Sequence, residues 1–335
     1  MTRTRDVAGA PARRLLRVGA VVGALGLVVW AATRVDWRVM WASLRDVDLG
    51  VWLLAAAVGA VVKLGGKIAR SHALVVAVAR ARGVAPSSLG ATARLFASTH
   101  AIGQVLWPPV GMSLRTVGLV RDGFSVGAAA EVQVGERIAE AVALAAMAAV
   151  MAVAAPGALG QLFGSAAPWI VFGVAAAIAV VMVAALGSRR VRRAWTTGWM
   201  PLVVASGFAL LSHAGDVAIL LLAAHAAHVS VGIAAVLVAF VAVNSAAIIP
   251  LVPGQLGVLE AAVVFGLAYG GVAAEPALAV ALVYRAAYLL PLVALGLPST
   301  VIESMKRRRS NRPCSWAGAH SSCSGDSPLT LPMKP

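Results

Sequence analysis

Three cationic side chains interrupt a long apolar run in the first quarter of the chain. Lys63, Lys67 and Arg70 stand at positions i, i+4 and i+7 of a segment that extends from about Val51 to Val78. This spacing places all three on one face of a helix. Charges inside an apolar helix are costly unless they face a polar cavity, or reach the membrane surface along an aliphatic stem. Lys67 and Arg70 fit either arrangement, whereas Lys63 favours a polar interior.

Other ionisable or polar side chains of the same kind fall within apolar runs further along the chain. A guanidinium suits a phosphate group, because it binds two oxygen atoms at once. A nearby carboxylate would neutralise the cations of an empty site or bind a cationic group. With Lys63 and Arg70, these residues predict a cavity for a charged headgroup. Any single pair, such as Glu260 with Arg285, is equally consistent with a structural ion pair. These residues are Arg115, Glu136, Arg137, Asp216, Glu260, Tyr284 and Arg285.

Two clusters of proline and glycine break apolar runs. The first is Trp107-Pro-Pro-Val-Gly-Met-Ser-Leu-Arg115; the second, Ile248 to Glu260, contains Pro253, Gly254 and Gly257. Proline removes a backbone donor and glycine loosens the helix, so each cluster predicts two half-helices that meet at a turn. The alternative is a plain loop between two spanning helices. Exposed backbone at membrane depth requires a polar cavity or surrounding protein, which makes the breaks candidate binding elements.

The breaks occupy corresponding places in two halves of the chain. Each half consists of a span, a charged span, a break, and a span that carries an arginine. The first half would start from the cytoplasm and the second from outside, which predicts inverted repeats with a site near the midplane between the breaks. We expect six full spans with two re-entrant or broken-helix hairpins, or up to ten spans if every arm crosses.

Composition places these elements in a membrane. Of 335 residues, 60% are hydrophobic and 12% are charged, which is typical of an all-α polytopic helix bundle. The net charge of +15 gathers in short loops on one predicted side, so we expect positive-inside topology rather than nucleic-acid binding. This predicts a multi-pass protein of the cell (cytoplasmic) membrane with both termini cytoplasmic. We predict a basic N-terminus at 1–14, one transmembrane domain at 15–303 with halves at about 15–155 and 168–300, and a disordered tail at 304–335.

Known catalytic motifs are absent from the sequence. It has no phosphate-binding loop, no Gly-x-Ser-x-Gly elbow and no zinc-protease motif, so we expect no catalytic residues, cofactor or metal. His225-x-x-His228 has two metal-binding side chains, but such a pair is more typical of a polar loop. The expected partners are membrane lipids with anionic or phosphate-bearing headgroups, and an oligomer is compatible with these features.

Several motifs together resemble one known family. They are Pro253-Gly-Gln-Leu-Gly-Val-Leu-Glu260, Tyr284-Arg285 with Tyr288, Glu136-Arg137 and Pro109-Val-Gly-Met-Ser-Leu-Arg115. In order and spacing the chain is similar, over about residues 15–300, to the transmembrane region of lysylphosphatidylglycerol synthases, a group of flippase-like membrane proteins. The chain differs from that pattern in the first break, where Gly111-Met-Ser-Leu-Arg115 lacks the usual carboxylate.

The resemblance implies a translocating unit that moves a phospholipid or a lipid-linked polar group between leaflets. We expect no enzymatic activity, because the tail after Lys306 is too short for the soluble aminoacyl-transfer domain of the synthases. Two other functions remain open. One is an enzyme or accessory subunit that acts on polyprenyl-phosphate-linked glycans. The other is a secondary transporter of small solutes.

Overall fold

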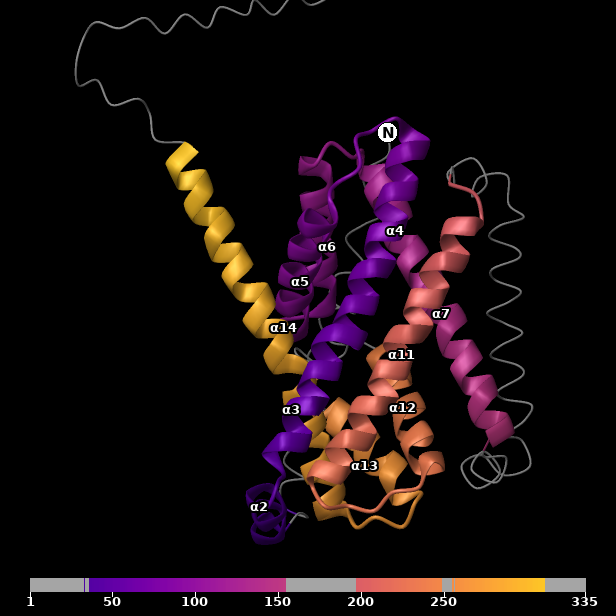
Figure 1. Ribbon diagram of the computed structural model, residues 1–335, viewed down its shortest axis with the longest axis vertical. Helices are drawn as coiled ribbons and strands as arrows, with labels where there is room; N and C mark the ends of the chain where they lie inside the picture. The colour runs from indigo at the N-terminus through magenta and orange to yellow at the C-terminus, as the bar shows by residue number, and fades with distance from the viewer. Residues whose placement is uncertain (1–32, 34–35, 155–196, 249–254, 256, 311–335) are drawn as a thin grey trace, which may run out of the picture.

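The computed structural model describes residues 33, 36–154, 197–248, 255 and 257–310. The predicted basic N-terminus and the tail beyond residue 310 lie outside the described residues. Within those ranges every regular element is a helix, as predicted for an all-α bundle (Figure 1). The elements are α2 (Trp37–Arg45), α3 (Leu49–Val58), η1 (Gly59–Leu64), α4 (Gly65–Arg82), α5 (Leu89–Val105), α6 (Pro108–Arg121), α7 (Val126–Ala154), α11 (Met200–Ala226), α12 (Ile233–Ile248), α13 (Val258–Ala268) and α14 (Ala274–Ser310).

Three of the described helices are long and apolar enough to cross a membrane: Leu49–Arg82, Met200–Ala226 and Ala274–Gly296. The first joins α3, η1 and α4 without a gap, the second is α11, and the third is the first part of α14. The helix α7 is similarly long at 29 residues but carries several ionisable side chains. Residues 304–310, which the sequence places in the tail, form the last turns of α14.

Local sequence explains where the first long helix begins and ends. Asp48 precedes α3, and its side chain accepts hydrogen bonds from the backbone N–H groups of Gly50 and Val51 at 2.8 and 3.1 Å. These are donors that a helix start otherwise leaves unsatisfied. At the other end Gly83 adopts φ +66°, the left-handed conformation that commonly terminates helices.

Two pairs of shorter helices form hairpins between the long helices. The arms α5, α6, α12 and α13 have 17, 14, 16 and 11 residues. At about 1.5 Å per residue they are about 16 to 26 Å long, less than the roughly 30 Å hydrocarbon layer. Each hairpin occupies one half of the height of the bundle, and the two enter from opposite ends (Figure 1). The described arms therefore form two pairs of short helices, inverted relative to each other, that reach only part of the way through the bundle.

Glycines let the two arms of each hairpin touch. A Cβ atom on Gly103 of α5 would lie 3.3 Å from the Cα atom of Gly111 on α6. In the second hairpin, a Cβ atom on Gly266 would overlap the backbone of Ala239. Small residues at such crossings allow close helix packing in membranes. Pro108 and Pro109 begin α6, where a missing backbone donor is tolerated.

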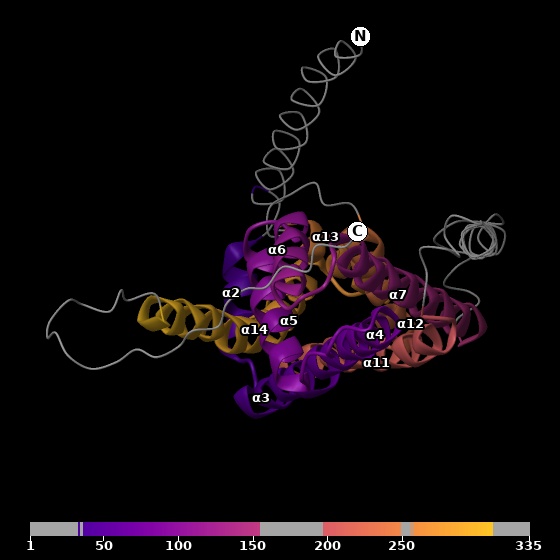
Figure 2. The ribbon, with the colours of Figure 1, turned by 90° about the horizontal axis from the view of Figure 1, so that it is seen from above.

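Each hairpin packs on a long helix of the other half of the chain. The helix α5 lies against α14, and α12 contacts α7, as the view along the bundle also shows (Figure 2). The contact of α5 with α14 is close, because a Cβ atom on Gly296 would lie 2.6 Å from the carbonyl oxygen of Ala97. At the centre, α4 packs on α11, so the two halves share one interior.

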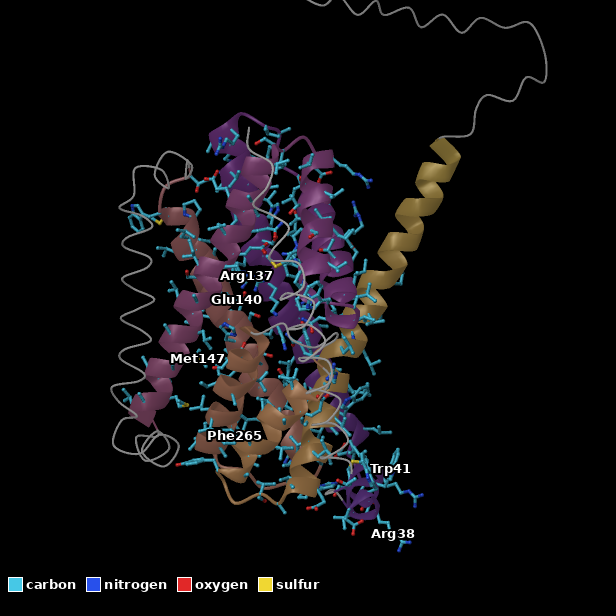
Figure 3. The ribbon with its side chains drawn as sticks, turned by 180° about the vertical axis from the view of Figure 1, so that it is seen from behind. Arg38, Trp41, Arg137, Glu140, Met147 and Phe265 are labelled. Carbon is cyan, nitrogen blue, oxygen red and sulfur yellow. The ribbon has the colours of Figure 1, made fainter. Side chains whose placement is uncertain are left out.

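The short helix α2 lies at the end of the bundle where the second hairpin enters. Arg38 and Trp41 project there (Figure 3). Trp37 and Trp41 are 46% and 59% exposed, whereas Met40 between them is buried. Exposed tryptophans on a short helix with one buried face are typical of an element at the membrane interface.

Candidate functional site

A π-helical turn brings Lys63 into the centre of the bundle. The turn η1, Gly59–Leu64, is a widening of the helix that is frequent at functional sites. Glycines around it allow close approach of two other helices. A Cβ atom on Gly59 would lie 2.9 Å from the carbonyl oxygen of Ala287 on α14, and one on Gly215 of α11 would lie 3.1 Å from the backbone nitrogen of Lys63. The side chain of Lys63 is thereby buried.

Lys63 forms one buried cluster with Asp216 and Tyr284. Its ammonium group makes an ion pair with Asp216 and donates a hydrogen bond of 3.2 Å to the Tyr284 hydroxyl. That hydroxyl donates a hydrogen bond of 2.8 Å to Asp216 Oδ1. The Lys63 ammonium also lies 3.4 Å from the centre of the Tyr288 ring, close enough for a cation–π interaction. Three residues of the predicted set, from three helices, are therefore in direct contact.

The helix α7 supplies acids to cations from two neighbouring elements. Glu136 accepts a hydrogen bond of 2.6 Å from Arg115 of α6. One turn later, Glu140 pairs with Arg70 of α4 at 3.3 Å and with Arg137 at 2.7 Å. The pairs Arg115–Glu136 and Arg70–Glu140 cross-link three elements of the first half. Arg70, Arg115, Glu136 and Arg137, all predicted from the sequence, thus lie in one connected region.

Arg115 is held from three sides. Besides Glu136, its Nε atom donates a hydrogen bond of 3.3 Å to Thr99 on α5. Its guanidinium lies 4.1 Å from the centre of the Phe96 ring, also on α5. The cation is therefore fixed in orientation by both arms of the first hairpin and by α7.

The second break carries the ion pair between Glu260 and Arg285 that the sequence suggested. The other oxygen of Glu260 accepts a hydrogen bond of 2.8 Å from the backbone N–H of Gly257, which adopts φ +80°. Glu260 thus caps α13 and ties its start to α14. Pro253 and Gly254, also predicted for the site, lie outside the described residues.

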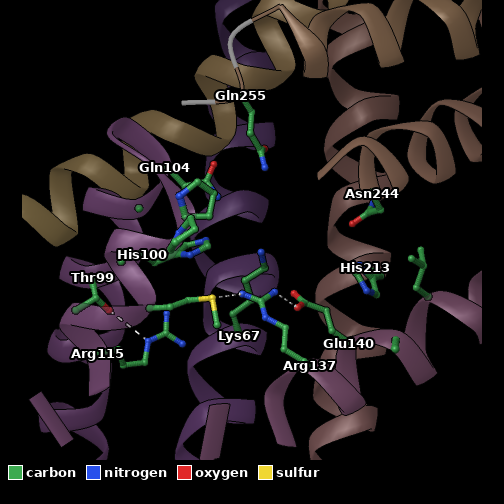
Figure 4. Close-up of a pocket in the computed structure, with 17 residues that line it drawn as sticks. Lys67, Thr99, His100, Gln104, Arg115, Arg137, Glu140, His213, Asn244 and Gln255 are labelled. Atoms are coloured by element: carbon green, nitrogen blue, oxygen red, sulfur yellow. Dashed lines mark hydrogen bonds and ion pairs between the residues drawn. The ribbon is translucent and has the colours of Figure 1, made fainter. Parts of the chain in front are cut away.

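Between the two hairpins lies a cavity of about 510 Å³ (Figure 4). The first hairpin contributes Thr99, His100, Gln104 and Arg115, and the second contributes Asn244. Side chains of α4, α7 and α11 complete its wall, together with the turn of the second hairpin. The lining residues from these parts are Lys67, Arg137, Glu140, Ala141, Leu144, His213 and Gln255. A cavity between the interrupted segments was expected from the inverted order of the halves.

Cations outnumber acids in the cavity wall. Lys67, Arg115 and Arg137 line it, with Glu140 as the one carboxylate among the described lining residues. Arg115 and Arg137 each have an acidic partner, but no ion pair to Lys67 occurs among the described residues. The Lys67 ammonium lies 5.7 Å from the centre of the Tyr288 ring. The wall therefore attracts an anion most strongly near Lys67.

Of the predicted site residues that the structure describes, two, Arg115 and Arg137, line the cavity itself. Lys63, Arg70, Glu136, Asp216 and Tyr284 lie behind the wall, where they pair with one another or with lining residues, and the Gly257, Glu260 and Arg285 group supports the second break. Sequence reasoning left out Lys67, His100, Gln104, Glu140, His213, Asn244 and Gln255. Two of these residues could have been added to the predicted site from the sequence. Lys67 shares the helix face of Lys63, and His213 stands one turn before Asp216.

Metal binding has no support within the described part of the chain, where three or more His, Cys, Asp or Glu side chains do not gather at any point. Nε2 of His228, from the sequence pair noted above, donates a hydrogen bond of 2.9 Å to the carbonyl oxygen of Asp46. This contact fixes the loop after α11 to the segment before α3. His228 therefore has a structural contact in that loop.

Comparison with known proteins identifies one family. No curated protein sequence matches the chain. The model of the family described as lysylphosphatidylglycerol synthase TM region matches residues 16–296. This match covers both hairpins, the four long described helices up to the middle of α14, and every residue of the cavity wall. The chain therefore belongs to the lysylphosphatidylglycerol synthase transmembrane-region family, a family of integral membrane proteins.

Proposed function

We propose that this protein moves a lipid with an anionic, phosphate-bearing headgroup between the leaflets of the cell membrane, without changing the lipid chemically. The observation that carries the proposal is the cavity between the inverted hairpins, with Lys67 unpaired among the described residues in its wall. A headgroup that crosses hydrocarbon must exchange its water for fixed charges and dipoles. Lys67 and Arg115 supply these for a phosphate.

The dimensions and the opening of the cavity fit a headgroup rather than a whole lipid. About 510 Å³ lies within the range of pockets that hold small polar molecules, roughly 300 to 1,000 Å³. Arg137 lines the cavity and is 58% exposed along its side chain, so the cavity opens beside α7. In this proposal the acyl chains stay in the bilayer next to α7 while the headgroup passes through the cavity between the two hairpins.

The same proposal includes an orientation. Arg80, Arg82 and Arg121 lie at the end of the bundle from which the first hairpin enters. Cations gather on the cytoplasmic side of membrane proteins. We therefore place this end in the cytoplasm and α2 outside, with both termini cytoplasmic.

Reconstitution in liposomes tests the proposal. Fluorescent phosphatidylglycerol would be followed with a membrane-impermeant quencher, beside lysyl-lipid, polyprenyl-phosphate lipid and phosphatidylcholine. We expect the anionic lipids to cross faster with protein than without it, and phosphatidylcholine to be unaffected. Lys67→Gln should slow the crossing about tenfold, because a charged hydrogen bond is worth about 1.5 kcal/mol. Arg94→Gln, an exposed cation on α5 outside the cavity, is the matched control and should keep the full rate.

Two outcomes would replace the proposal. Mass spectrometry of the recovered lipid would reveal a changed product if the protein were an enzyme of lipid-linked glycans. Uptake of a soluble ion or solute into the liposomes, with no lipid movement, would identify a small-solute transporter. Equal rates of lipid crossing for Lys67→Gln and the unaltered protein would show that the headgroup does not pass through this cavity.

A further inference from the structure

His213 is a buried side chain whose hydrogen-bonding groups are unused. It stands on α11, is 3% exposed, and lines the cavity. Neither Nδ1 nor Nε2 has a hydrogen-bond partner among the described residues. Burying such groups without partners costs about 1 to 3 kcal/mol each, and native proteins usually avoid it. An unpartnered imidazole in a cavity wall therefore indicates a group that gains a partner when the cavity is occupied.

The imidazole also faces a carboxylate. Nδ1 of His213 lies 3.9 Å from Oδ2 of Asp216, one turn further along α11. The other oxygen, Oδ1, is already occupied by Lys63 and Tyr284. Asp216 thus has one oxygen satisfied and one directed at a ring that is slightly beyond hydrogen-bond range. A protonated imidazole has two N–H donors, of which one could serve this oxygen and the other the cavity.

An aromatic ring and several charged or titratable side chains surround His213. The ring of Phe240 on α12 packs edge-on at 5.3 Å and holds the imidazole in place. Glu140 shares the cavity wall with His213 and interacts with it electrostatically. The remaining charged and titratable groups on this side of the bundle are Lys63, Lys67, Arg70, His100, Arg115, Arg137, Asp216, Tyr284 and Tyr288. Cations prevail among these groups, so an anion that enters the cavity offsets a net positive charge around His213.

We propose that His213 binds a proton together with the anionic headgroup, so that the protein is a proton–lipid symporter. This inference rests on the function proposed above. The proton comes from water in the cavity, binds to a ring nitrogen of His213, and returns to water when the headgroup leaves. While bound, the imidazolium pairs with Asp216 Oδ2 on one side and with the headgroup phosphate on the other. No covalent bond to the lipid is made or broken.

Thermodynamic linkage makes the coupling reciprocal. If the headgroup strengthens proton binding, the proton strengthens headgroup binding by the same factor. One coupled proton gives an affinity for the headgroup that falls by up to about tenfold per pH unit. Phosphatidylglycerol suits this test, because its phosphodiester stays ionised between pH 5.5 and 8.5.

The experiment measures binding and protons in one sample. Purified full-length protein in a weakly buffered detergent solution is titrated with short-chain phosphatidylglycerol, while a pH indicator records proton uptake. We expect uptake that approaches one proton per lipid at the upper end of the pH range. His213→Gln should bind lipid with no uptake and a flat pH profile. His225→Gln, an exposed histidine on the same helix, is the matched control and should behave as the unaltered protein does.

Each result decides between the two proposals. Lipid binding by the unaltered protein without proton uptake overturns the coupling and leaves the lipid site intact. Undiminished uptake in His213→Gln assigns the proton elsewhere and also overturns the inference. Failure of the unaltered protein to bind lipid overturns both. If His213→Gln does not fold, the uptake and pH profile of the unaltered protein, which need no variant, still decide whether a proton is coupled.

Discussion

Lys63 and Asp216, one from each half of the chain, form a single ion pair in which both side chains are 5% exposed. The pair joins the π-helical turn of the first long helix to the middle of α11, with Tyr284 of α14 bonded to both partners. Three helices thus share one buried charge cluster behind the cavity. Its stability depends on all members being present, because a lone charge in this place has no water to solvate it.

The first prediction concerns this pair. Lys63→Met should lower the free energy of unfolding by about 3 to 5 kcal/mol, because Asp216 is left buried and unpaired. The double variant Lys63→Met with Asp216→Leu should recover most of that loss. Unfolding in detergent, followed by circular dichroism, provides the measurement. Lys67→Met, one turn away and without an ion pair among the described residues, should cost less than about 1 kcal/mol. An equal loss in Lys63→Met and Lys67→Met would contradict the prediction.

A second prediction concerns the arms of the first hairpin. Gly111→Ala should destabilise the protein by about 1 to 3 kcal/mol, since the new methyl group would lie 2.9 Å from the Cα atom of Gly103. Gly207→Ala on α11 has nothing within 4 Å and should instead stabilise by roughly 0.5 to 1 kcal/mol through the helix preference of alanine. Melting temperatures of the two variants should therefore shift in opposite directions. A shift in the same direction would mean that the arms separate readily.

The third prediction concerns the support of the second break. Glu260→Ala removes both the cap on Gly257 and the partner of Arg285, so the turn that carries Gln255 loses its anchor. We expect Glu260→Ala and Arg285→Ala to remain folded by size-exclusion chromatography but to lose lipid movement in liposomes. Glu275→Ala, in the first turn of α14 and outside this cluster, is the control. Full transport in both variants would show that the break needs no such anchor.

The fourth prediction tests the orientation of the bundle. In a background with Cys314 and Cys323 replaced by serine, Arg38→Cys and Arg121→Cys place single thiols at opposite ends. A membrane-impermeant maleimide applied to intact cells should label Arg38→Cys and leave Arg121→Cys unlabelled until the membrane is opened. The reverse pattern would invert the topology. Labelling of both from outside would contradict the placement of the two ends on opposite sides of the membrane.

The sequence was informative wherever a residue stood out against an apolar background. Long apolar runs identified the spanning helices among the described residues, and the two prolines before α6 identified the turn of the first hairpin, because these residues act on the backbone of their own segment. The Glu260–Arg285 pair was also expected, since each charge requires a nearby partner in hydrocarbon. The partners of Lys63 and Arg70 were not assigned, because pairing across helices depends on how the helices rotate about their axes.

The cavity wall was harder to predict for the same physical reason. Thr99, Gln104 and Asn244 are ordinary in type, and only the packing of the hairpins makes them face one space. The π-helical turn was also unforeseen, although it determines the direction of Lys63. Such a turn shifts the face of a helix by about one residue, which a strict 3.6-residue period does not anticipate.

Each hairpin packs on a long helix of the other half of the chain, and this has a consequence for synthesis. The helix α5 rests on α14, which leaves the ribosome only after all the other described helices have been made. The first hairpin therefore enters the membrane long before its final neighbour exists. During that interval Arg115 can already pair with Glu136, which belongs to the same half and is made soon after it. The ion pair thus neutralises the charge of the buried Arg115 until the second half of the chain has been made.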